Sequence, residues 1–85
     1  MSDPLAEPST RVVLLGRAGC HLCDEARVVV SDVCSALGQT WVERDVDDHP
    51  DLRERYTDLV PVVLVDGEDV AHYRVSRAVL RAALV

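Results

Sequence analysis

The sequence contains two cysteines, Cys20 and Cys23, that are separated by two residues in a short stretch holding two glycines. Residues three positions apart on a helical turn lie on the same face of the helix. Two thiols placed in this way can form a disulfide, which needs Cα atoms roughly 4.4–6.8 Å apart. The pair therefore predicts thiol–disulfide exchange without unfolding of the domain. The same spacing also occurs in soft-metal sites, because thiolates bind copper(I), zinc and iron–sulfur clusters.

The position of the pair in the chain predicts different roles for its two sulfurs. A short apolar run ends at Gly16 and a helical pattern begins at His21, so the pair lies where a strand passes into a helix. The N–H groups and the dipole at such a helix start lower the pKa of a cysteine from ~8.5 to about 3.5–7.5. Cys20, at the helix start, is predicted to be the attacking sulfur. Cys23 is predicted to be the resolving sulfur, which displaces the partner from the mixed disulfide.

Charged neighbours of Cys20 act on its sulfur in opposite directions. Arg17 and His21 place positive charge near this sulfur and are candidates for the substrate-binding part of the site. Asp24 and Glu25 add negative charge in the same turn. Acidic residues favour a helix N-terminus for electrostatic reasons, so these two need no catalytic role.

A closed metal centre is not expected in this chain. Structural zinc is held by four ligands, and the other cysteine and histidine candidates stand singly at Cys34, His49 and His72. Cys34 follows Cys23 by eleven residues, or ~16 Å along a helix axis, which is too far for a disulfide. We therefore expect Cys34 to be a core thiol, and we predict no metal site and no permanently bound cofactor.

Hydrophobic periodicity predicts the elements that position the cysteine pair. Residues 12–15 form a continuous apolar run, as in a strand covered on both faces. Residues 21–37 have apolar side chains at helical spacing, and Gly38 follows as a stop signal. Residues 41–46 alternate as an edge strand does, so the first half of the domain is predicted to be a βαβ unit.

The second half of the domain is predicted to be antiparallel. Residues 47–50 form a turn that leads into a short helix ending near Tyr56. The apolar run 62–65 leads through Asp66-Gly67, a two-residue hairpin signal, into a strand over residues 68–72. Ser76 can cap a final helix over residues 77–84. The order βαβαββα predicts an α/β fold, a four-stranded mixed sheet with helices on its faces.

The composition is that of a small, acidic, aliphatic chain. Among 85 residues, 48% are hydrophobic but only three are aromatic, and the net charge of −6 disfavours binding to nucleic-acid phosphates. No apolar run is long enough to span a membrane, and residues 1–10 carry acids and prolines where a secretory signal is basic and apolar. We expect a flexible tail over residues 1–10 and one domain over residues 11–85. We expect a cytoplasmic monomer that binds neither nucleic acid nor membrane.

Four segments of the sequence resemble the small glutaredoxin-like proteins of the thioredoxin superfamily. They are residues 20–23 (CHLC), 43–47 (ERDVD), 59–63 (LVPVV) and 66–67 (DG). The resemblance implies the thioredoxin-like fold of a minimal glutaredoxin. It also implies a cis bond between Val60 and Pro61 that faces the cysteine pair. Val60 would then offer its backbone N–H and C=O to the extended main chain of the substrate.

The chain departs from typical glutaredoxins at three places, one of which holds the γ-glutamyl end of glutathione in that family. Typical members carry Pro-Tyr between the cysteines, Thr before Val-Pro, and Gly-Gly followed by Asp. This chain has residues 21–22 (HL), Leu59 and residues 72–76 (HYRVS) there. Arg27 and Arg74 are candidates to meet a carboxylate of the co-substrate, with a solvated arginine on a helix face as the alternative. The resemblance leaves open whether glutathione or another low-molecular-weight thiol is the co-substrate.

The leading functional hypothesis is a thiol–disulfide oxidoreductase. It exchanges disulfides with a protein or a low-molecular-weight thiol and is recharged by an unidentified reductase. One alternative is a protein that binds a soft metal or an iron–sulfur cluster through the same cysteines. A second alternative is a redox-silent adaptor with a thioredoxin fold.

Overall fold

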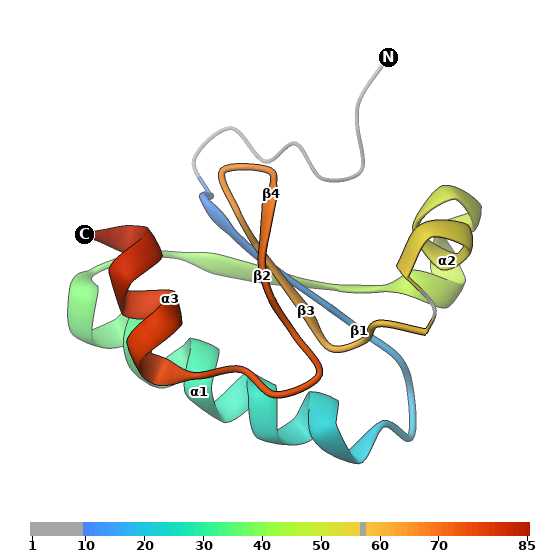
Figure 1. Ribbon diagram of the computed structural model, residues 1–85, viewed down its shortest axis with the longest axis horizontal. Helices are drawn as coiled ribbons and strands as arrows, with labels where there is room; N and C mark the ends of the chain where they lie inside the picture. Colours follow the sequence, from blue (N-terminus) through green and yellow to red (C-terminus); the bar gives the residue numbers. More distant parts are fainter. Residues whose placement is uncertain (1–9, 57) are drawn as a thin grey trace.

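The computed structural model describes residues 10–56 and 58–85 and has its elements in the predicted order (Figure 1). Residues 1–9 of the predicted tail and Thr57 lie outside the described residues, and Thr10 forms an isolated β-bridge. The prediction lacks the 3₁₀ turn that follows the second strand. This turn begins at Val46, so the strand predicted over residues 41–46 ends one residue earlier, at Asp45. The elements are β1 (Val12–Gly16), α1 (His21–Leu37), β2 (Trp41–Asp45), the 3₁₀ helix η1 (Val46–Asp48), α2 (Pro50–Tyr56), β3 (Val62–Val65), β4 (Glu68–His72) and α3 (Arg77–Leu84).

The four strands form one mixed sheet in the order β2-β1-β3-β4. β1 pairs with β2 in parallel, while β3 is antiparallel to both β1 and β4. Every residue of β1 and of β3 is buried, whereas the edge strands β2 and β4 are partly exposed. This difference explains the continuous apolar runs of the central strands, because a strand covered on both faces has no solvent-facing position. The predicted α/β fold with a four-stranded mixed sheet is confirmed.

The helices cover the two faces of the sheet unequally. α1 and α3 lie next to one another on one face, and α2 packs on the other face together with η1 (Figure 1). Alternate residues of each central strand supply the two cores. The α1 and α3 core receives Val12, Leu14, Val63 and Val65 from the sheet. The α2 core receives Val13, Leu15, Val62 and Leu64.

Helix α1 is the longest element and has a defined cap at each end. Cys20 is the N-cap residue, and its sulfur accepts a hydrogen bond from the N–H of Cys23. Gly38 ends the helix with φ +67°, a left-handed conformation that glycine adopts without steric cost. Its N–H donates to carbonyls of the last helical turn, as the sequence predicts. In the described part of the chain, no helix is both long and apolar enough to cross a membrane.

The β3–β4 hairpin turn is tied to the start of the first strand. Asp66 and Gly67 both have positive φ, 53° and 85°, as a two-residue hairpin turn of the I′ type requires. The Arg11 guanidinium donates to both carboxylate oxygens of Asp66, and the shortest N···O distance is 2.9 Å. The hydrogen bond from Arg11 lowers the pKa of the Asp66 carboxyl below its usual value. The predicted hairpin is therefore present, and its turn is anchored to the start of the neighbouring strand β1.

Two valines of α1 allow a matched test of the core. Val30 is fully buried between α1 and the sheet, whereas Val28 is 56% exposed on the same helix. We expect Val30→Ala to lower the free energy of unfolding by about 2 kcal/mol, from lost transfer energy and the cavity left behind. Val28→Ala should change it by less than ~0.5 kcal/mol. Both changes raise helix propensity equally, so urea unfolding followed by circular dichroism isolates burial. Equal losses in the two variants would contradict this packing.

Candidate active site

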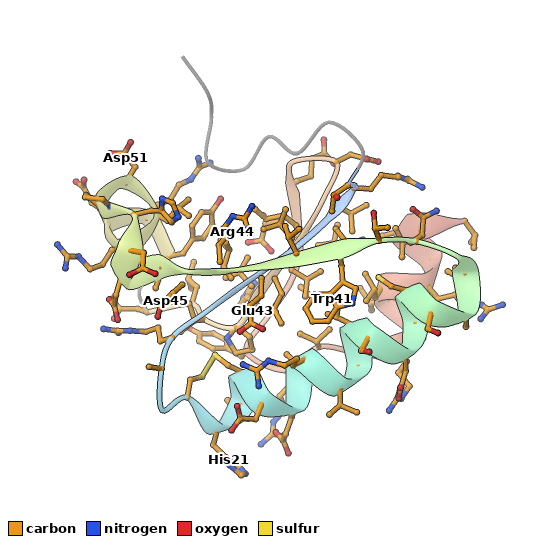
Figure 2. The ribbon with its side chains drawn as sticks, turned by 180° about the vertical axis from the view of Figure 1, so that it is seen from behind. His21, Trp41, Glu43, Arg44, Asp45 and Asp51 are labelled. Atoms are coloured by element: carbon orange, nitrogen blue, oxygen red, sulfur yellow. A yellow bond between two sulfur atoms is a disulfide. The ribbon has the colours of Figure 1, made fainter. Side chains whose placement is uncertain are left out.

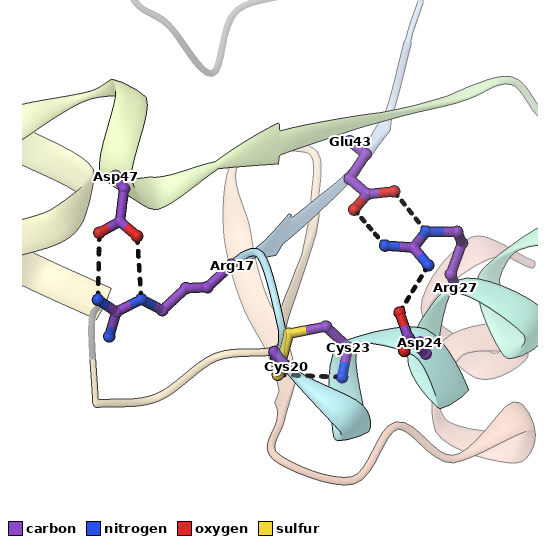
Figure 3. The surroundings of a disulfide bond; sticks show 7 residues. All are labelled: Arg17, Cys20, Cys23, Asp24, Arg27, Glu43 and Asp47. Atoms are coloured by element: carbon purple, nitrogen blue, oxygen red, sulfur yellow. Dashed lines mark hydrogen bonds and ion pairs between the residues drawn. A yellow bond between two sulfur atoms is a disulfide. The ribbon is translucent and has the colours of Figure 1, made fainter.

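Cys20 and Cys23 lie where β1 passes into α1 and are joined by a disulfide (Figure 3). Their Cα atoms are 5.2 Å apart, within the range that a disulfide accepts. Gly19, with φ +75°, turns the chain from the strand into the helix. The N–H of Cys23 donates to the Cys20 sulfur over 3.1 Å. A thiolate on Cys20 would receive the same hydrogen bond, together with the favourable field of the helix N-terminus.

The two sulfurs differ sharply in their access to solvent. Cys20 is partly exposed, whereas Cys23 is 1% exposed. Gly16, at the end of β1, explains the burial of Cys23. A Cβ atom added to Gly16 would lie only 3.3 Å from the Cys23 sulfur, so this sulfur packs directly against the strand backbone. A partner molecule can therefore reach Cys20 but not Cys23.

The Val60-Pro61 bond is cis, as the family resemblance implies. Pro61 is buried and immediately precedes β3. In the antiparallel pairing of β1 with β3, Val62 is the partner of Leu15. The start of β3 therefore lies beside the end of β1, at one end of the two central strands. This register brings the segment with Val60 and Pro61 to the same end of the sheet as the cysteine pair, which follows β1.

Tyr73 holds the segment before β3 in place, and the sequence did not reveal this role. Its backbone N–H donates to the Pro61 carbonyl over 2.9 Å. Its hydroxyl donates to the Asp58 carbonyl over 2.8 Å. Tyr73 has φ +63°, which costs a residue with a Cβ roughly 1–2 kcal/mol. The sequence carries no signal for this arrangement, because it depends on the end of β4 lying beside the cis-proline segment.

The structure places the two expected sources of positive charge, Arg17 and His21, in different surroundings. Arg17 donates through Nε and Nη2 to the two carboxylate oxygens of Asp47, each over 3.2 Å (Figure 3). Its charge is therefore shared with an acidic residue of η1. His21 is exposed, and its ring points outward from the first turn of α1 (Figure 2). Neither side chain makes a hydrogen bond to the Cys20 sulfur in the structure.

Arg27 binds carboxylates of the protein itself. Its Nε and Nη2 donate to the two carboxylate oxygens of Glu43, each over 2.8 Å, and its Nη1 donates to Asp24 over 2.9 Å (Figure 3). These hydrogen bonds, to Glu43 first and then to Asp24, raise the pKa of Arg27 further above its usual value. The sequence offered a carboxylate of the co-substrate or a solvated helix face as alternatives for Arg27, and neither included these contacts within the protein. Glu43 belongs to a segment that carries the family resemblance, but no local pattern predicts that its side chain pairs with Arg27.

The remaining cysteine lies apart from the site. Cys34 is fully buried in the α1 and α3 core, as expected, and burial raises the pKa of its thiol. Among residues 10–56 and 58–85, no group of three or more His, Cys, Asp or Glu side chains is placed to hold a metal ion.

The chain is similar to known proteins over nearly its whole length. Residues 11–85 match the family model described as Glutaredoxin-like domain (DUF836). Uncharacterized proteins of Mycobacterium bovis and Mycobacterium tuberculosis are each 36% identical to it over 77 residues, which is 85% of this chain and 79% of theirs. The region matched by the family model, residues 11–85, includes the cysteine pair, the cis-proline segment and the Arg27 and Glu43 ion pair of this chain.

Two solved structures are similar in both fold and sequence. Protein XcR50 from X. campestris has a TM-score of 0.71 and 27% identity, and the match covers 86% of this chain and 93% of that one. Protein Ne2328 from Nitrosomonas europaea has a TM-score of 0.73 and 26% identity, with 96% of each chain covered. The fold is therefore shared across these proteins with few insertions.

The differing burial of the three cysteines predicts an order of alkylation. In the reduced, folded protein, iodoacetamide should modify Cys20, because it is the only one of the three that solvent reaches. Cys23 and Cys34 should react only when the protein is unfolded in concentrated guanidinium chloride. Mass spectrometry of proteolytic peptides after timed quenching measures this order. Modification of Cys34 as fast as Cys20 in the folded protein would contradict the placement of these thiols.

Proposed function

Since the chain belongs to the glutaredoxin-like domain family, we propose that it is a thiol–disulfide oxidoreductase with Cys20 and Cys23 as its redox centre. One observation carries this proposal: the two cysteines form a disulfide at the start of α1, and only Cys20 is accessible. A partner sulfur can therefore attack or be attacked at one defined atom. The second sulfur is held in reach of that atom by the helical turn.

In the reduced protein, Cys20 acts as the nucleophile. Its thiolate is stabilised by the Cys23 N–H and by the helix dipole. The nearby negative charge of Asp24 is shared with Arg27, which reduces its opposition to the thiolate. The Cys20 thiolate attacks one sulfur of a partner disulfide, forms a mixed disulfide and releases the other partner sulfur as a thiolate.

Cys23 then completes the transfer of two electrons. Its sulfur attacks the Cys20 sulfur, forms the Cys20–Cys23 bond and breaks the bond between Cys20 and the partner. The partner leaves as a second thiol, and the chain remains oxidised until an external dithiol or reductase reverses these steps. The burial of Cys23 supports this role, because an internal sulfur meets the mixed disulfide but not free partners.

We propose that Val60 binds the partner's main chain. Val60 precedes the cis proline at the start of β3, so its backbone lies at the same end of the sheet as Cys20, which follows β1. Arg27 is already bound by Glu43 and Asp24, which leaves Arg74 as the candidate for a co-substrate carboxylate. Because Arg27 is paired within the protein, we favour as partner a disulfide-containing protein, or a low-molecular-weight thiol that binds differently from glutathione in typical glutaredoxins. We place the activity in the cytoplasm, where reducing conditions permit a dithiol to cycle.

A redox titration tests the proposed function directly. The protein is equilibrated in graded mixtures of reduced and oxidised dithiothreitol and quenched with an alkylating agent. Mass spectrometry then gives the number of alkylated thiols in each mixture. We expect a single reversible two-electron transition that involves Cys20 and Cys23. Cys34→Ala, which changes only a buried core thiol, should give the same transition. Failure of the pair to oxidise would favour the adaptor, and one equivalent of co-purifying metal would favour the metal-binding alternative.

Substitution of each cysteine separates their roles. Cys20→Ser should abolish reduction of a model disulfide such as the Ellman reagent, because the buried Cys23 sulfur cannot take its place. Cys23→Ser should react once and then accumulate the mixed disulfide on Cys20, visible as a stable mass increase. The assignment is wrong if Cys23→Ser turns over with dithiol reductants as fast as the unsubstituted protein.

A further inference from the structure

The resolving sulfur of Cys23 raises a question of proton transfer. A thiol must lose its proton before it attacks a disulfide, because the thiolate is the nucleophile. Burial favours the neutral thiol over the thiolate, and Cys23 is 1% exposed. Bulk water therefore has poor access to the proton of Cys23 in the mixed disulfide. A group of the protein near this sulfur would be needed to receive it.

Glu43 is the acidic side chain that borders the same space as the Cys23 sulfur. A Cβ atom built on Gly16 would lie 3.3 Å from the Cys23 sulfur and 3.8 Å from Oε2 of Glu43. The sulfur and the carboxylate oxygen are thus neighbours of one position, which is vacant because residue 16 has no side chain. Figure 2 shows Glu43 projecting from β2 toward α1, whereas Arg44 projects from the other side of the strand.

The orientation of Glu43 follows from the register of the sheet. Glu43 pairs with Leu14, whose side chain is in the α1 core, and Gly16 lies two residues further along β1. Residues two apart in a strand point to the same face, so Glu43 and Gly16 both face α1. The side chain of Glu43 is 34% exposed, which gives the carboxylate a path to solvent for the proton that it takes up.

We propose that Glu43 is the proton acceptor for Cys23, and that Arg27 is the positioning residue that holds it there. This proposal rests on the proposed function. In the mixed disulfide, the Glu43 carboxylate takes the proton of the Cys23 thiol, directly or through one water molecule. The Cys23 thiolate attacks the Cys20 sulfur, the Cys20–Cys23 bond forms, and the partner leaves as a thiolate. That thiolate is protonated by Glu43, which returns the proton it took from Cys23, or by solvent.

The ion pair with Arg27 fits this role electrostatically. Arg27 holds both carboxylate oxygens at 2.8 Å and follows Cys23 by four residues, on the same face of α1. Each carboxylate oxygen has a second lone pair, so both contacts leave acceptor capacity. When Glu43 takes up the proton, the positive charge of Arg27 remains and favours the thiolate that has just formed.

Several other charged groups face this region and are part of its pH dependence. Asp24 of α1 shares Arg27 with Glu43. Arg17 and Asp47 form a separate ion pair beside the disulfide (Figure 3). Asp45, at the end of β2, uses its side chain to accept the N–H of Asp47. Only Glu43 among these acids is within contact distance of the position that also contacts the Cys23 sulfur.

The test measures ring closure by Cys23 alone. Reduced protein is mixed with a small excess of the Ellman reagent in a stopped-flow instrument, over a range of pH. The first release of thionitrobenzoate reports attack by Cys20, and the second release reports attack by Cys23 on the mixed disulfide. Near neutral pH, Glu43→Gln should slow the second release about tenfold or more, in line with general base catalysis, and leave the first nearly unchanged.

The pH profile separates proton transfer from a merely structural effect. At alkaline pH the Cys23 thiol ionises without help, so Glu43→Gln should approach the unsubstituted rate. Glu43→Asp, which keeps a carboxylate, should recover part of the rate and also serves if Glu43→Gln does not fold. Asp32→Asn is the matched control, because it breaks an α1 ion pair with Arg77 on the α3 side of the helix. Both of its releases should keep their rates.

The outcomes distinguish this inference from the function on which it rests. If the unsubstituted protein gives no second release, the oxidoreductase proposal itself fails. If it gives both releases and Glu43→Gln gives the second at the same rate at every pH, Glu43 is not the acceptor. A faster second release in Glu43→Gln would also overturn the inference, because it would mean that the carboxylate acts only as a like charge that opposes the thiolate.

Discussion

The burial of β1 and β3 on both faces is the constraint on which the rest of this small domain depends. Nearly all side chains of these strands are aliphatic. They pack into two separate cores, one between the sheet and α1 and α3, and one between the sheet and α2. With few aromatic residues to fill space, the fold relies on this double coverage. The two strands also position the candidate site. β1 leads into the turn and the first residues of α1 that carry the cysteines, and β3 begins directly after the cis proline.

Gly16 connects the packing of the central strand to the chemistry of the site. The last residue of β1 has no side chain, so the Cys23 sulfur can rest against the strand backbone. The same absence leaves room for the carboxylate of Glu43 on the neighbouring strand. A Cβ atom at this position would lie 3.3 Å from the Cys23 sulfur and 3.8 Å from Oε2 of Glu43, so a larger residue would crowd both groups. The absence of a side chain at Gly16 thus contributes to the burial of the Cys23 sulfur, while Cys20 remains accessible.

Arginine ion pairs surround the Cys20–Cys23 disulfide. Arg17 with Asp47, and Arg27 with Glu43 and Asp24, flank the disulfide on two sides. Such exposed pairs contribute little to stability, with a median of about 0–1 kcal/mol each. Their effect here is on local charge, because the acids nearest to the cysteines are balanced by guanidinium groups in a molecule with a net charge of −6. A thiolate at Cys20 is thereby spared part of the repulsion that the composition alone would suggest.

The sequence by itself determined the order of the elements, the hairpin at Asp66-Gly67 and the location of the cysteine pair at a strand–helix junction. These features follow from local periodicity and turn chemistry, which are encoded within short windows. The cis Val60-Pro61 bond came from the family resemblance. Only the tertiary structure decided that Arg27 binds Glu43, that Tyr73 holds the cis-proline segment, and that Glu43 and Cys23 both border Gly16. Each of these arrangements brings together residues at least twelve positions apart, and their meeting depends on strand register and helix packing, which no local pattern specifies.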